Sequence, residues 1–358
     1  MQLRAPALGP PPFVHETLPQ RIVYGPGRFA DVGDEVRGLG FARPLIVATP
    51  GRRGAAERVR EAAGGTVFAE AKMHAPAEVV EAAGRVMDEA GADGLVSCGG
   101  GSALGIAKAL AHLRQVPILA VATTYSGSEG TARWSIMKDG NKAGAVDPIV
   151  LPRTVIYDPE LTVSLPREVS APSGMNAMAH AVACLYEASS SPIHRLLAAD
   201  ALARMARALP AIEADPSDLA ARGDALIASF LCGTVMPATL GVHHKCAHVL
   251  GGAYALPHAE VHTVLLPHTA AYNAQAAPDA ARIIAAALGG EAPGPALHAL
   301  LSSISAPTSL TALGLARDAV PRAAEVVCAA ELSGPRPADE SSVRAMLERA
   351  WAGEPPTA

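Results

Sequence analysis

The chain has 358 residues, and its 34 acidic against 29 basic side chains give it a net charge of −5. This length is about twice that of a typical domain of roughly 100 to 200 residues, so we expect two domains. The charge balance and the lack of a long basic run exclude the surface expected of a nucleic-acid-binding protein. Half of the residues are hydrophobic but only 4% are aromatic, which favours a compact fold rich in helices.

The five cysteines form no C-x-x-C pair. This is typical of a reducing compartment and gives no zinc or disulfide framework. The N-terminal sequence MQLRAPALGPPPF contains prolines where a signal peptide requires an unbroken apolar stretch. No apolar run reaches the roughly 18 residues of a membrane span. We therefore expect a cytoplasmic protein with no membrane segment.

In chain order, the first half alternates short apolar, β-rich runs with amphipathic stretches. Strands are predicted at 21–24, 44–48, 66–69, 94–98, 117–122, 134–138 and 154–158, and helices at 56–64, 77–91 and 102–113. Because a strand that alternates with helices needs crossover connections, this pattern predicts a parallel α/β sheet.

The second half changes to long Ala- and Leu-rich helices with almost no strand signal, at 195–209, 218–236 and 279–288. Pro159, directly after the last predicted strand, is a natural boundary signal. We therefore predict an α/β dinucleotide-binding domain over residues 1–165 and an all-helical domain over residues 166–358.

A glycine-rich loop follows the predicted strand at 94–98, where Gly99, Gly100, Gly101 and Ser102 lead straight into a helix. Glycines let the backbone approach a pyrophosphate closely, and the amides and dipole of a helix N-terminus favour negative charge. The alternative is a tight turn in which Ser102 caps the helix. Because the loop follows the fourth predicted strand and not the first, an ordinary Rossmann dehydrogenase is disfavoured.

A second loop follows the strand at 117–122 and carries the hydroxyls of Thr123, Thr124, Ser126 and Ser128. At the carboxyl end of a strand beside the glycine loop, these side chains would line the crevice where ligands bind in such sheets. Clusters of Ser, Thr and Gly are also ordinary loop sequences, so this segment alone is weak support.

Histidine is concentrated in one stretch of the second half. Six of the twelve histidines lie within 26 residues, where an even spread would place about one: His243, His244, His248, His258, His262 and His268. Asn176 and His180 are four residues apart, as are His244 and His248, and His258 and His262, so on a helix each pair projects from one face. Grouped imidazoles indicate a metal site or an acid–base site, whereas a lone buried histidine more often satisfies a core hydrogen bond.

In their order and spacing, these segments resemble the iron-containing alcohol dehydrogenase superfamily, and more closely its maleylacetate reductase branch. The matching segments are 21–27, 99–108, 123–129, 151–162, 173–180, 243–248 and 257–262. The resemblance implies the dehydroquinate-synthase-like fold, a nucleotide domain followed by a helical one, in a chain that commonly forms a homodimer.

The resemblance places the family's metal ligands, one Asp and three His, at Asn176, His180, His244 and His258. The acid is absent here. A neutral carboxamide lacks the negative charge that would offset a dication. We therefore expect an enzyme that works without metal, as the reductase branch is understood to do.

The implied reaction is hydride transfer from NADH or NADPH to the conjugated double bond of maleylacetate, giving 3-oxoadipate in the degradation of aromatic compounds. Imidazole can stabilise an enolate and deliver a proton near neutral pH. We expect His243, His244 and His248 to be catalytic, with Asn176, His180 and His258 shaping the pocket. Cations are needed for a dicarboxylate, and the candidates, each of which could also be a solvated surface charge, are Lys245, Arg133 and Arg153.

The expected cofactor-binding residues are Gly99, Gly100, Gly101, Ser102, Thr123, Thr124, Ser128, Thr49 and Lys142, the last reaching the phosphates. After the strand at 44–48 two arginines follow Thr49, and the ribose-binding Asp or Glu is missing, so we expect NADPH to be accepted beside NADH. Three alternatives stay open: a metal-dependent alcohol dehydrogenase with Asn176 as a weak ligand, a dehydroquinate-synthase-like lyase without net NAD(P)H turnover, and a binding protein without catalysis.

Overall fold

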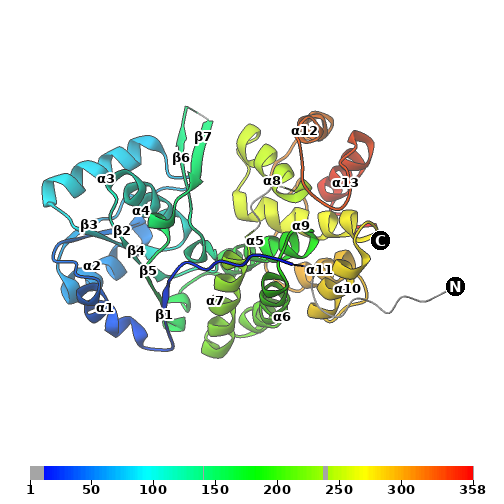
Figure 1. Cartoon of the computed structure of the whole chain (residues 1–358). Coiled ribbons are helices and arrows are strands. Elements are labelled where there is room, and N and C mark those ends of the chain that lie inside the picture. The colour runs from blue at the N-terminus through cyan, green and yellow to red at the C-terminus, as the bar shows by residue number, and fades with distance from the viewer. Residues whose placement is uncertain (1–11, 140, 237–240, 358) are drawn as a thin grey trace.

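The computed structural model describes residues 12–139, 141–236 and 241–357, and places a sheet-containing half beside a helical half (Figure 1). The sheet has six strands in the order β1-β8-β5-β4-β2-β3, and every pairing within it is parallel. The strands are β1 (Arg21–Tyr24), β2 (Pro44–Ala48), β3 (Thr66–Phe68), β4 (Gly94–Gly99), β5 (Ile118–Ala122) and β8 (Thr154–Tyr157). The predicted parallel α/β sheet is confirmed.

Helices cover both faces of the sheet. Leu45 and Val47 of β2 pack with α3 (Ala77–Ala90) and α4 (Gly101–Arg114), whereas the alternate residues of β2 pack with α1 (Val32–Gly38) and α2 (Arg53–Ala63). Because successive strand residues point to opposite faces, a strand covered on both sides must be apolar throughout. That is why these strands are visible in the sequence as continuous apolar runs.

An antiparallel hairpin stands apart from this sheet, built from β6 (Arg133–Lys138) and β7 (Asn141–Val146). Figure 1 shows it on the side of the sheet half that faces the helices. The sequence predicts a strand at 134–138 but none at 141–146, because Asn, Lys, Ala and Gly have low strand propensity. Pairing with β6 supplies the hydrogen bonds that make this segment a strand.

The helical half is confirmed as such, with no strand among its described residues from 167 onward. Its helices are α5 (Arg167–Tyr186), α6 (Pro192–Ala214), α7 (Leu219–Thr234), α8 (Val242–Ala253), α9 (His258–Ala274), α10 (Pro278–Ala287), α11 (Pro293–Ser302), α12 (Ala319–Cys328) and α13 (Glu340–Ala352). No helix in the described part of the chain is long and apolar enough to cross a membrane.

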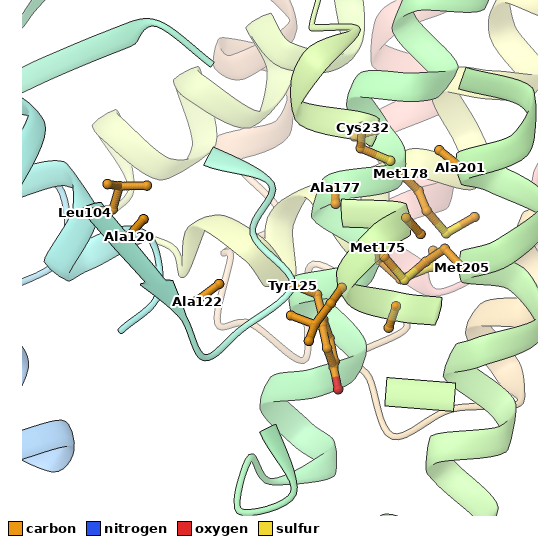
Figure 2. Packing of buried hydrophobic residues seen from close by; sticks show 14 of the residues in the cluster. Leu104, Ala120, Ala122, Tyr125, Met175, Ala177, Met178, Ala201, Met205 and Cys232 are labelled. Atoms are coloured by element: carbon orange, nitrogen blue, oxygen red, sulfur yellow. The ribbon is translucent and has the colours of Figure 1, made fainter. Parts of the chain in front are cut away.

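One hydrophobic cluster runs through both halves. Figure 2 shows Leu104 and Ala122 of the sheet half and Met175 and Met205 of the helices in this cluster, with Tyr125 between them. The domain boundary near residue 165 falls in the connection between β8 and α5 and stays a prediction, because this core is continuous across it.

The two halves are locked together where the loop after β5 meets α7. A Cβ on Gly127 would lie 2.4 Å from the carbonyl oxygen of Ser229, so only glycine permits this approach. The fully buried Arg222 of α7 donates a hydrogen bond of 2.9 Å to the Tyr125 hydroxyl. We call the boundary between the sheet half and the helical half the seam. At this end of the seam, the loops after β4 and β5 are held in a fixed position against the helices.

Candidate active site

The glycine loop lies between β4, which ends at Gly99, and α4, which begins at Gly101. Gly100 is the N-cap residue, and no side chain caps the first-turn amides of α4. Because the first amides of a helix lack partners within the helix, they are available to an anion. Ser102 lies inside the first turn, so the alternative that it caps the helix is wrong.

The two loops predicted to bind the cofactor lie against each other. A Cβ on Gly100 would lie 2.5 Å from Thr124 Oγ1, and one on Gly101 would lie 4.0 Å from Ser128 Oγ. The hydroxyl of Thr123 is buried without a hydrogen-bond partner. The structure therefore brings the glycines and the hydroxyls together at one edge of the sheet.

The other two predicted cofactor residues lie at different distances from this loop. Thr49 follows β2 directly, and because Ala48 pairs with Cys98, it lies beside the carboxyl end of β4. Lys142 belongs to β7, opposite Met137, but its side chain lies outside the described part of the structure.

The predicted histidines converge from three helices. Asn176 and His180 lie on α5, His243, His244 and His248 on α8, and His258 and His262 on α9. The ring of His244 stacks on that of His180 with 4.8 Å between centroids and lies 5.3 Å from that of His262. The pairs four residues apart do share helix faces, and those faces meet in one cluster.

Hydrogen bonds order the rings within the cluster. His243 Nε2 lies 2.8 Å from His262 Nδ1, and His244 Nε2 lies 3.0 Å from His180 Nδ1. The other nitrogen of His243, Nδ1, lies 2.8 Å from Thr269 Oγ1. The sequence does not predict the contact of His243 with Thr269 or with His262, because these partners lie 26 and 19 positions away in the chain.

Burial keeps these imidazoles neutral. It lowers the pKa of His243 to about 3, with neighbouring imidazoles adding to the effect. The pKa values of His244 and His262 are lowered well below the ordinary value for the same reasons. Burial lowers the pKa of His180 to about 4, and the positive charge of Arg133 contributes. At neutral pH these four rings are therefore neutral donors and acceptors.

The cluster reaches the seam between the two halves through His248 and His258. His248 is exposed, and its ring lies 6.4 Å from that of His258. On the other side of the seam, His74 lies edge-on to His258 at 5.9 Å. His74 is not among the residues predicted from the sequence. The feature that could have indicated it is its position in the loop after β3, which leaves the same edge of the sheet as the glycine loop.

The three predicted cations have different positions. Arg133 begins β6, and its positive charge contributes, after burial, to the lowered pKa of His180. Lys245 is half-exposed on α8, and its role stays a prediction. Arg153 precedes β8, at the amino-terminal edge of the parallel sheet. The expectation that Arg153 serves the pocket is wrong, because the loops of the site leave the opposite edge.

The residues at the family's metal-ligand positions do not fit a divalent ion in this arrangement. Among the residues that the structure describes, no three His, Cys, Asp or Glu side chains are grouped so that they could hold a metal. Asn176 offers only a neutral oxygen, and its Oδ1 is buried without a partner. His180 and His244 direct ring nitrogens at each other, so one nitrogen must donate to the other instead of both facing an ion.

A glycine loop at the carboxyl edge of a parallel sheet, facing imidazoles from a helical half, is the arrangement of a dinucleotide-dependent reductase. The chain belongs to the iron-containing alcohol dehydrogenase family. The model of the iron-containing alcohol dehydrogenases matches residues 19–159, and the model of the C-terminal part of that family matches residues 170–351.

Similar proteins cover the chain from end to end. A maleylacetate reductase of Sphingobium indicum is 42% identical over 348 residues, which are 96% of this chain and 99% of that protein. The crystal structure of maleylacetate reductase from Agrobacterium tumefaciens is 42% identical with a TM-score of 0.92, and the match covers 97% of this chain and 100% of that one.

A more distant relative was solved with a dinucleotide. The sulfoacetaldehyde reductase from Bifidobacterium kashiwanohense, in complex with NAD+, is 25% identical with a TM-score of 0.86, and the match covers 94% of this chain and 98% of that one. The resemblance drawn from the sequence motifs is therefore confirmed over nearly the whole chain.

Proposed function

We propose that this protein reduces maleylacetate to 3-oxoadipate with NADH or NADPH. The observation that carries the proposal is a cluster of neutral imidazoles with the cation of Arg133 acting on it. The cluster lies across the seam from the glycine loop at the N-terminus of α4. The full-length similarity to maleylacetate reductases supports the same substrate.

The chemistry suits such a site. Hydride adds to the conjugated carbon–carbon double bond, and the substrate's own carbonyl draws the negative charge onto its oxygen as an enolate. What the protein must supply is hydrogen bonding to that enolate and a proton. His243, His244 and His248 are the proposed catalytic groups, and Asn176, His180 and His258 line the pocket.

Charge and hydrogen bonding orient the two reactants. Arg133 and Lys245 are proposed to pair with the substrate carboxylates, since a charged donor makes the stronger hydrogen bonds to a carboxylate. The amides of Gly100 and Gly101, with the hydroxyls of Ser102, Thr123, Thr124 and Ser128, are proposed to hold the dinucleotide phosphates. Thr49 is proposed to contact the ribose, and Lys142 the phosphates.

The proposed reaction proceeds without metal. The support is the donor set itself, in which Asn176 brings no negative charge and His180 and His244 bond to each other. An isolated ketone needs an electrophile to accept hydride at its carbon, whereas a conjugated system already carries one. This separates the proposal from the metal-dependent alcohol dehydrogenases of the same family.

The test is consumption of NAD(P)H in the presence of freshly prepared maleylacetate, followed by absorbance, with 3-oxoadipate identified as the product. Chlorinated analogues of the substrate extend the assay. Conversion of the substrate to a different product, without net loss of NAD(P)H, would instead favour a lyase of the dehydroquinate-synthase type. No product at all would leave a binding protein.

A homodimer in the cytoplasm is proposed as the working form. The strand β1 is at the edge of the sheet, and the segment before it exposes Phe13 and Val14, which are 45% and 87% accessible. An open strand edge beside exposed apolar side chains is a pairing surface. The five cysteines are all free thiols, as in a reducing compartment. Sedimentation of the purified protein measures its oligomeric state.

A further inference from the structure

Thr269 lies at the end of a chain of hydrogen bonds that leads into the histidine cluster. Its Oγ1 is 2.8 Å from His243 Nδ1, and His243 Nε2 is 2.8 Å from His262 Nδ1. All three side chains are buried. The ring of His262 lies 4.5 Å from that of His258, which is the histidine at the seam. The chain therefore connects the interior of the helical half with the seam.

The chain can exist in two neutral arrangements. In the first, the Thr269 hydroxyl donates to the carbonyl oxygen of Leu265, 3.0 Å away, and accepts from His243 Nδ1–H. His243 Nε2 then accepts from His262 Nδ1–H, so His262 Nε2 has a free electron pair. In the second, Thr269 donates to His243 Nδ1, His243 Nε2–H donates to His262 Nδ1, and His262 Nε2 holds a proton.

The inner end of the chain is open to water. Thr269 and His243 both line a pocket between α5, α8 and α9, with Ala183, Tyr186 and Asn273 on its other walls. About 30 Å³ of it is accessible to the centres of water-sized molecules, which is room for roughly two waters. Every described residue that lines it belongs to the helical half, and neither His258 nor His262 is among them. The pocket therefore borders Thr269, His243 and His244, but not His262 or His258, the histidine at the seam.

We infer that Thr269, His243 and His262 form a proton relay, which carries a proton from water entering the pocket beside Thr269 to the enolate formed by hydride transfer. This deepens the proposed function and rests on it. His262 is the donor to the reacting atoms. Thr269 and His243 act through it as positioning residues, so for His243 this inference replaces the direct catalytic role proposed above.

In one turnover, each residue of the relay gives one proton and takes one. The nicotinamide gives its hydride with both electrons, and the enolate takes the proton of His262 Nε2. His262 Nδ1 then takes the proton of His243 Nε2, His243 Nδ1 takes that of the Thr269 hydroxyl, and Thr269 Oγ1 takes one from a pocket water. The water is restored by a proton from solvent. One solvent proton is thus consumed for each NAD(P)H oxidised, and every ring stays neutral at the end of the transfer.

The need for such a relay follows from burial. A charged imidazolium is costly in a buried cluster of imidazoles, so a proton stored on one ring is disfavoured. A concerted shift along hydrogen bonds avoids that charge. It also lets the seam exclude water around the nicotinamide while the proton still comes from solvent.

The relay is tested with Thr269→Val, which keeps the shape of the side chain and removes its hydroxyl. In single-turnover experiments we expect NAD(P)H oxidation to slow by roughly 10- to 100-fold with little change in KM, as for loss of one acid–base group. The wild-type rate should depend on the deuterium content of the solvent along a curve, because several protons move together, and the variant should lose that curvature. Thr269→Ser should restore both.

Thr263→Val is the matched control. Thr263 is also buried on α9, but its hydroxyl donates to the carbonyl oxygen of Ala259 and to no ring. Equal losses in the two valine variants would assign the effect to packing and overturn the relay. A Thr269→Val enzyme with the wild-type rate and isotope curve would also overturn it.

The pocket is tested with Ala183→Leu, which fills it and should slow the same step. An unchanged rate in a folded Ala183→Leu enzyme overturns the role of the pocket.

A measurement without substrate separates this inference from the proposed function. In protein labelled with ¹⁵N-histidine, removal of the Thr269 hydroxyl should shift the ring-nitrogen resonances of His243 and His262, and unchanged resonances overturn the chain of hydrogen bonds. If Thr269→Val shifts these resonances but the wild-type enzyme does not oxidise NAD(P)H with maleylacetate, the proposed substrate is overturned while the chain of hydrogen bonds stands.

Discussion

The ring of His74, from the sheet half, lies edge-on to the ring of His258, from the helical half, with 5.9 Å between their centroids. These residues are 184 positions apart in the chain. His74 has a left-handed backbone, with a φ of 64°, in a loop that leaves the same edge of the sheet as the glycine loop. The histidine cluster therefore continues across the seam to a residue of the sheet half.

We predict that His74→Ala lowers kcat/KM for maleylacetate by about tenfold, since it removes a ring that the sheet half brings against His258. The thermal unfolding midpoint should not change, because the side chain is exposed. His15→Ala is the control, as His15 packs on His194, away from the cluster. Equal kinetics in both variants would remove His74 from the site.

We predict that His244→Ala lowers turnover by at least about 100-fold, the scale expected for a lost acid–base or enolate-binding group. The dissociation constant of the dinucleotide, measured by fluorescence or calorimetry, should be nearly unchanged because His244 lies on α8 and not on the glycine loop. A variant that loses cofactor affinity but keeps its turnover number would contradict the proposed catalytic role.

Metal content should not affect the rate. Because Asn176 supplies no charge and His180 bonds to His244, we expect equal kcat/KM for protein stripped with a chelator and for protein loaded with iron or zinc. Asn176→Asp restores an acid at this position and should raise the affinity for zinc, as measured by calorimetry. A strict metal requirement in the wild-type enzyme would refute the metal-free reaction.

NADPH should be a good substrate, and Arg52 should contribute to its binding. Arg52 follows β2 and donates a 3.0 Å hydrogen bond to Ser164 Oγ at the carboxyl edge of the sheet. We predict that Arg52→Ala lowers kcat/KM for NADPH about tenfold more than for NADH, since a guanidinium pairs with a phosphate but not with a hydroxyl. Arg60→Ala, which affects only a pair with Glu57 on α2, is the control. A strong wild-type preference for NADH would contradict the expectation.

Glu129 should make stability depend on pH. Its carboxyl group is buried, neither oxygen has a hydrogen-bond partner, and burial raises its pKa from 4.5 to about 7. A raised folded-state pKa contributes stability that is complete below pH 4.5 and is lost as pH rises through about 7. We therefore predict that Glu129→Gln flattens the fall in unfolding free energy over this range, as measured with urea. A parallel fall in both proteins would contradict the assignment.

Lys108 provides the matched comparison for Glu129. Its ammonium group donates to the carbonyl oxygens of Ser128 and Thr131 at 2.7 and 2.5 Å. Lys108→Met should lower the unfolding free energy at every pH, by about 1–3 kcal/mol for each carbonyl left without a donor. Because these carbonyls precede Arg133, the variant should also weaken substrate binding.

Several elements could be predicted from the sequence because their signal is local. The strand Pro44–Ala48 is buried on both faces and is apolar throughout, and the pairing of His244 with His248 follows from the period of a helix. The strand Asn141–Val146 could not be found in this way, since its residues have no strand preference and its partner β6 determines its structure. Arg153 is a candidate for the pocket from its motif alone, because a motif match carries no information about which edge of the sheet a residue occupies.

By itself, the sequence determined the parallel α/β half, the helical half, the glycine loop and the excess of histidine, because burial, helical period and turn chemistry are properties of neighbouring residues. The tertiary structure decided which of those histidines touch. It placed His74 against His258, ordered Thr269, His243 and His262 into one line of hydrogen bonds, and brought Arg133 to His180. Contacts of this kind depend on how helices and loops far apart in the chain pack together, and no local pattern encodes them.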